Sequence, residues 1–68
     1  MVDVNALRAE MVRNGYTQKE LAKKLEMSEK TLVSRLKRKA FGTDEAQVLI
    51  EILNIKNPAE IFFANIVS

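Results

Sequence analysis

The sequence predicts an all-α fold of five short helices, because three kinds of signal agree along the chain. Apolar residues recur at the three- and four-residue spacing of a buried helix face. Glycine, asparagine or proline stands at three of the four breaks between these segments. A residue suited to capping a helix precedes each of them: Asp3, Thr17, Ser28, Thr43 and Asn57. No run alternates between apolar and polar residues as a strand does.

The first two helices are predicted over about residues 4–14 and 18–25. Asn14-Gly15 supplies a left-handed stop for the first helix. Thr17-Gln18-Lys19-Glu20 has the pattern of a capping box, in which the Thr hydroxyl accepts from the Glu amide and the Glu side chain reaches back. The residues expected to face the core are Val4, Leu7, Met11, Leu21, Ala22 and Leu25.

The other three helices follow in the second half of the chain. Ser28 is expected to cap a helix over about residues 29–39, and Phe41-Gly42 interrupts the pattern. Thr43 is expected to cap the next helix, which runs to about Leu53, and Asn57-Pro58 opens the last one. The expected core residues are Leu32, Leu36, Ala46, Leu49, Ile50 and Leu53, and the last helix would hold Ile61, Phe62, Phe63, Ile66 and Val67.

Composition and charge restrict the classes of function. The 68 residues are 47% hydrophobic and contain neither cysteine nor histidine, which excludes disulfides and thiolate metal sites and removes the commonest general base. No apolar run is long enough for a membrane span or a secretory signal, and the absence of cysteine fits a reducing cytosol. Residues 1–39 carry ten Lys/Arg against five Asp/Glu (+5), whereas residues 40–68 carry one against four (−3). A polyanion would therefore be attracted to the first part of the chain.

The segment from residue 17 to residue 39 carries the functional signal. Two short helices are joined by Glu26-Met27-Ser28, and the second helix is basic. Ala22 is small enough for the two helices to cross closely, and Met27 can fill the turn. Because Leu32 and Leu36 fix the second helix to the core, its outer positions are left free to enter a major groove.

At these residues the chain resembles the XRE family, the lambda-repressor-like helix-turn-helix regulators that include phage repressors and Cro. The matching string is T-Q-K-E-L-A-K-K-L-E-M-S-E-K-T-L, from Thr17 to Leu32. The resemblance implies one compact five-helix DNA-binding domain over residues 1–68, with its helix-turn-helix over residues 17–39 formed by helices 2 and 3. It also implies a sequence-specific transcriptional regulator, a phage or prophage repressor whose partner is double-stranded DNA. Such a regulator would be cytoplasmic, in a bacterial cell or a phage-infected host.

The resemblance assigns roles to individual residues. Those that match phosphate contacts are Thr17, Gln18, Ser28, Lys37 and Arg38, and those at base-reading positions are Glu29, Lys30, Val33 and Ser34. Thr31 and Leu32 match inward, structural positions. The helix dipole alone is an alternative explanation for Glu29 at a helix start and for the cations at a helix end.

Two residues depart from the family pattern. Glu26 stands where the family usually has glycine in a turn of positive φ, so the fold would gain stability from glycine there if the backbone is left-handed. Arg35 stands where an apolar residue is usual, three residues after Leu32. This departure leaves open which of Val33, Ser34 and Arg35 points outward.

Two further interpretations remain open alongside the repressor. A modulator or antirepressor of the same fold would bind a partner repressor protein through residues 29–34 or through the last helix, and the chain could also be the excised DNA-binding domain of a longer repressor. The last helix has more apolar residues than a small core can absorb, so Phe62, Phe63 and Ile66 are candidate contacts for a homodimer or another protein. We expect no catalytic residue, metal, cofactor or small-molecule substrate, because the carboxylates stand without a histidine or a phosphate-binding loop.

Overall fold

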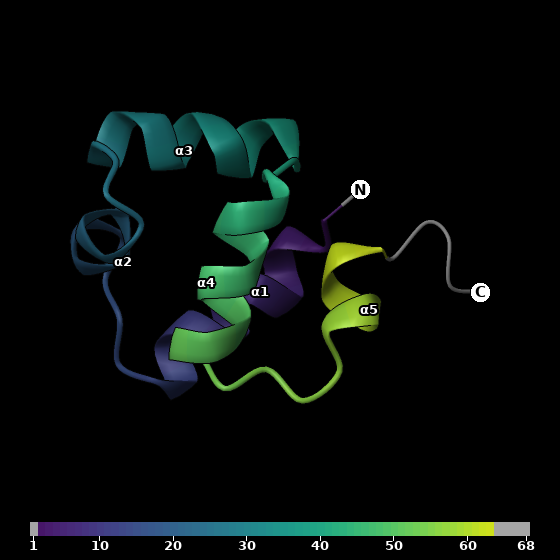
Figure 1. Cartoon of the computed structure of the whole chain (residues 1–68). Helices are drawn as coiled ribbons and strands as arrows, with labels where there is room; N and C mark the ends of the chain where they lie inside the picture. The colour runs from purple at the N-terminus through teal and green to yellow at the C-terminus, as the bar shows by residue number, and fades with distance from the viewer. Residues whose placement is uncertain (1, 64–68) are drawn as a thin grey trace.

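Five α-helices joined by short connections make up the fold, as the computed structural model shows for residues 2–63, the part of the chain that it describes (Figure 1). Their bounds are α1 Val4–Arg13, α2 Gln18–Lys24, α3 Glu29–Arg38, α4 Thr43–Ile52 and α5 Pro58–Phe62. Residues 2–63 contain no strand. The predicted all-α class is therefore confirmed, and the first four predicted helices end within one residue of the observed ones. The positions expected to extend the fifth helix, Ile66 and Val67, lie outside the described residues.

Side chains cap the first three helices as predicted. The Asp3 carboxylate accepts from the amide of Ala6 at 3.1 Å. The capping box of α2 is complete, because Thr17 Oγ1 accepts from the Glu20 amide at 3.1 Å and Glu20 Oε1 accepts from the Thr17 amide at 3.1 Å. Ser28 Oγ accepts from the amide of Thr31 at 3.1 Å. These bonds satisfy donors that a helix start leaves without an intrahelical partner.

The predicted cap of α4 is wrong, whereas that of α5 is confirmed in position but makes no side-chain hydrogen bond. Gly42 is the N-cap of α4, and Thr43 is already its first helical residue. The carboxylate of Glu45 accepts from the Gly42 amide at 2.8 Å and so fixes this earlier start. Asn57 holds the cap position of α5, but its side chain makes no capping hydrogen bond. Its backbone, at φ −123° and ψ 71°, lies outside the extended conformation usual for a side-chain cap.

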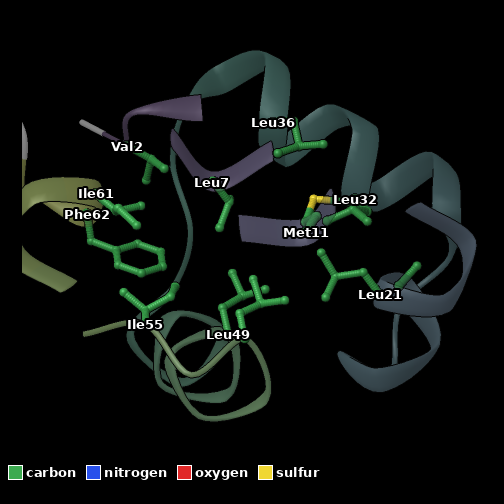
Figure 2. Packing of buried hydrophobic residues seen from close by; sticks show 12 residues of the cluster. Val2, Leu7, Met11, Leu21, Leu32, Leu36, Leu49, Ile55, Ile61 and Phe62 are labelled. Carbon is green, nitrogen blue, oxygen red and sulfur yellow. The ribbon is translucent and has the colours of Figure 1, made fainter. Parts of the chain in front are cut away.

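One core cluster gathers residues from all five helices (Figure 2). The buried side chains are Val2, Leu7, Met11, Leu21, Ala22, Leu32, Leu36, Leu49, Leu53, Ile55, Ile61 and Phe62. Several residues expected in the core are only partly buried and pack around it: Val4, Leu25, Ala46 and Ile50. Of the aromatic pair in the last helix, Phe62 is buried and Phe63 is 53% exposed. Fewer apolar residues are buried than the apolar pattern predicts, because the helices are short and their edges face solvent.

The residues before α1 are hydrogen-bonded to two parts of the chain that are distant in sequence. The amide of Val2 donates to the carbonyl of Lys39 at 2.9 Å, and the amide of Asp3 donates to the carbonyl of Ile61 at 2.7 Å. Val2 is buried, with 6% of its surface exposed. The chain before α1 therefore connects the end of α3 with α5, which the sequence did not predict.

Glu26 has a left-handed backbone, which is the condition for a gain in stability from glycine at this position. Its φ is +57°, a conformation that is unfavourable for a residue with a Cβ atom. We expect Glu26→Gly to raise the free energy of unfolding by about 1 kcal/mol, because relief of this strain exceeds the extra chain entropy of glycine. Thermal unfolding followed by circular dichroism measures the change. Lys23→Gly, inside α2, is the control and should be destabilising. A stability gain for both variants, or for neither, would contradict the prediction.

Candidate nucleic-acid interface

The outer face of α3 is an exposed basic surface. Lys30, Ser34, Lys37 and Arg38 are all exposed, and their spacings of three and four residues place them on one face of α3. The opposite face carries the buried Leu32 and Leu36. Figure 1 shows α3 along one edge of the molecule, with the other helices on its inner side. This face is therefore accessible to a large partner.

The packing of α2 against α3 holds this helix in place. Ala22, 2% exposed, belongs to the buried part of α2, and Leu21 and Leu32 enter the same core region (Figure 2). The Met27 amide donates to the carbonyl of Ala22 at 3.0 Å, and its side chain packs against the core. Close packing on both sides of the turn therefore holds α2 against α3.

The candidate phosphate contacts fall into two groups. Thr17, Gln18 and Ser28 lie at the N-terminal ends of α2 and α3, whereas Lys37 and Arg38 are exposed in the last turn of α3. The Thr17 and Ser28 hydroxyl groups already take part in their caps. Because α2 lies beside the N-terminal end of α3 (Figure 1), the two groups stand at opposite ends of the α3 surface. An extended anion could meet both groups at once.

The candidate base-reading residues are less uniform than expected. Glu29, Lys30 and Ser34 are exposed, but Val33 is only partly so. Val33 stands four residues after Glu29 and three before Leu36, and therefore lies on the flank between the outer and the buried face. Val33 is thus only partly turned outward, and of the three positions left open Ser34 is the exposed one.

Arg35 forms an ion pair that sequence reasoning missed. Its guanidinium Nε and Nη2 atoms donate to both carboxylate oxygens of Glu45 over 3.1–3.2 Å. The two side chains are 30% and 21% exposed. The hydrogen bonds from Arg35 are the main reason that the pKa of Glu45 lies below its ordinary value; burial opposes the shift, and the Gly42 amide adds to it. Two features of the sequence could have indicated this ion pair: Arg35 stands at a position that is usually apolar, and Glu45 is an acid in the first turn of the next helix.

A second surface of different character is an apolar groove of about 250 Å³ between α4 and α5. None of the residues that line it is charged: Val2, Phe41, Thr43, Ala46, Gln47, Ile50, Pro58, Phe62 and Phe63. Phe63 is 53% exposed, whereas Phe62 is only 6% exposed. Phe62 is thus a core residue and offers a partner little surface, which corrects its assignment as a contact. Ile66, the third candidate contact, lies outside the described residues.

The described part of the chain holds no group of three or more His, Cys, Asp or Glu residues that could bind a metal ion. Among residues 2–63, none of the helices has the length and apolar character that crossing a bilayer requires. Comparison with models of known protein families, with curated proteins and with solved structures gives no match. What the surface of α3 can do is therefore inferred from its own residues.

Proposed function

We propose that this protein is a sequence-specific DNA-binding transcriptional regulator, a phage or prophage repressor that acts in the cytoplasm by occupying an operator. In this proposal the fold is lambda-repressor-like, and α2 and α3 are its helix-turn-helix. The observation that supports it most is the exposed face of α3, with Lys30, Ser34, Lys37 and Arg38 opposite two buried leucines. A rigid helix with such a face has the size and charge that a major groove accepts.

The proposal divides the surface into positioning and reading contacts. Lys37 and Arg38, with Gln18 and the N-terminal end of α3, would bind phosphates and fix the orientation of the protein on the duplex. Lys30 can donate to the N7 and O6 acceptors of guanine, and Ser34 can donate or accept. These two exposed residues would therefore contribute most of the sequence preference.

A fluorescence anisotropy titration with labelled duplex DNA tests this function. Random duplexes are compared with sequences enriched by repeated selection, each at two or more salt concentrations. A DNA-binding regulator should enrich a defined sequence, bind it about 1,000-fold or more tightly than random DNA, and lose affinity steeply with salt. Failure to enrich any sequence would reject the proposal.

A second copy of the chain is the proposed occupant of the apolar groove between α4 and α5. A twofold interface brings the same surface of each copy together, and an uncharged groove with an exposed Phe63 at its border does so without like-charge repulsion at the contact. A dimer would read two half-sites about one helical turn apart on the same side of the DNA.

Phe63→Ser tests this dimer. We expect at least about a tenfold increase in the dimer dissociation constant, because an aromatic anchor of an interface typically contributes more than 1.4 kcal/mol. Sedimentation equilibrium measures the constant, and Val12→Ser is the matched control, since Val12 is 79% exposed on α1 and lies outside the groove. A wild-type protein that stays monomeric up to millimolar concentration, or equal effects of both substitutions, would refute the groove as the dimer contact.

The second candidate function is a modulator or antirepressor that binds a partner repressor protein. The exposed carboxylate of Glu29 at the leading end of α3 favours it, because an acid there repels phosphate but complements a basic protein surface. Glu29→Gln separates the two functions. The substitution should strengthen binding to random DNA in a repressor, and should weaken the complex with a repressor protein in an antirepressor.

A further inference from the structure

We propose that Glu45 is a positioning residue for DNA recognition, which holds the guanidinium of Arg35 away from the DNA-facing side of α3 and fixes the end of α3 to α4. This inference rests on the proposed DNA-binding function. Glu45 itself would not touch DNA. By pairing with Arg35, it leaves the other cations of α3 available to phosphates.

Arg35 stands at the border between the two faces of α3. It follows the buried Leu32 by three residues and precedes the exposed Arg38 by three. A side chain as long as arginine can reach from such a border toward either the outer face or the neighbouring helix. In the structure the Arg35 side chain reaches toward α4, where its Nε and Nη2 atoms donate to both carboxylate oxygens of Glu45 at 3.1–3.2 Å.

Glu45 is itself held in place by the connection between the helices. One of its oxygens accepts from the Gly42 amide at 2.8 Å while it also accepts from Arg35. The carboxylate therefore joins α3, the connection after it and the first turn of α4. The lowered pKa of Glu45 agrees with this environment. Two fixed partners give the pair a defined geometry, unlike a single exposed ion pair.

The pair has a consequence for specificity because of what a released Arg35 would do. The last turn of α3 already carries Lys37 and Arg38 in addition to Arg35. A further cation on the outer face would bind phosphates of any sequence, which raises affinity for random and specific DNA alike. A loosened α3 would at the same time place Lys30 and Ser34 less accurately against the bases. Engaging Arg35 with Glu45 thus favours the specific complex over the random one.

Two substitutions separate these effects, and a third is the control. Glu45→Gln should release Arg35, and so steepen the salt dependence of binding to random DNA by about 0.9 in log K against log[salt], the value of one phosphate contact. It should also reduce the ratio of specific to random affinity by about fivefold or more. Arg35→Met should leave that salt slope unchanged, because the paired Arg35 contacts no phosphate. Glu51→Gln removes the same charge from an exposed position of α4 and should change neither quantity.

Anisotropy titrations at four salt concentrations provide the slopes, and circular dichroism verifies that each variant is folded. A shallower slope for Arg35→Met would show that Arg35 already contacts phosphate, and equal behaviour of Glu45→Gln and Glu51→Gln would show a general charge effect; either result overturns the inference but leaves the DNA-binding function intact. Should Glu45→Gln fail to fold, the salt slope of Arg35→Met still tests the inference, because a shallower slope overturns it and an unchanged slope supports it. A wild-type protein without sequence preference would instead reject the proposed function, and this inference with it.

Discussion

Replacing Lys37 and Arg38 together by alanine is expected to weaken binding to every duplex DNA by about 10- to 100-fold at low salt. If each side chain neutralises one phosphate, the slope of log K against log[salt] should become shallower by about 1.8. Specific and random sequences should lose similar amounts, because phosphate contacts carry no sequence information directly. The stability of the fold should change little, since both residues are exposed at the end of α3. Anisotropy titrations over a range of salt concentrations measure both quantities.

The control for this variant must remove the same charge from another part of the surface. Arg13 and Lys56 line a pocket at the α4–α5 connection, which lies on the far side of the molecule from α3 in Figure 1. Replacing both by alanine lowers the net charge by the same two units, so it corrects for long-range attraction. If the two double variants lose DNA affinity equally, the contacts are not at the end of α3. A loss confined to one DNA sequence would assign Lys37 and Arg38 to base reading instead.

Leu32→Ala is expected to lower the free energy of unfolding by about 3 kcal/mol. Leu32 is fully buried between α2 and the rest of the core, and alanine would leave a cavity that the short helices cannot close (Figure 2). A domain of this size is stabilised by about 3–10 kcal/mol in total, so a large part of that stability depends on one side chain. The midpoint of thermal unfolding should fall by about 15 °C.

Val33→Ala is the matched control for this prediction. Val33 is the next residue of the same helix, but it lies on the partly exposed flank. Its truncation should cost no more than about 1 kcal/mol, as is usual for apolar side chains outside a core. Circular dichroism and urea unfolding should rank the two variants in this order. Similar losses for both would mean that α3 is held by its flank rather than by Leu32 and Leu36.

The sequence by itself determined the helices, and the reason is that their signals are local. The capping box of Thr17 and Glu20 and the caps of Asp3 and Ser28 each operate within four residues, so their chemistry is readable without the fold. The leucines at three- and four-residue spacings likewise identified most of the core. The positive φ of Glu26 was anticipated for the same reason, because a tight turn restricts its own backbone.

Tertiary structure decided which residues each helix leaves exposed. Phe62 and Phe63 are neighbours with similar side chains, yet only the first is buried, because the position of α5 against the core selects one of them. Val2 became a core residue through hydrogen bonds to segments that are far away in the sequence. Arg35 and Glu45 are ten residues apart and meet only because α3 and α4 are held at their observed angle. Such contacts depend on where whole helices lie, and helix positions follow from the packing of many side chains together, which no short stretch of sequence specifies.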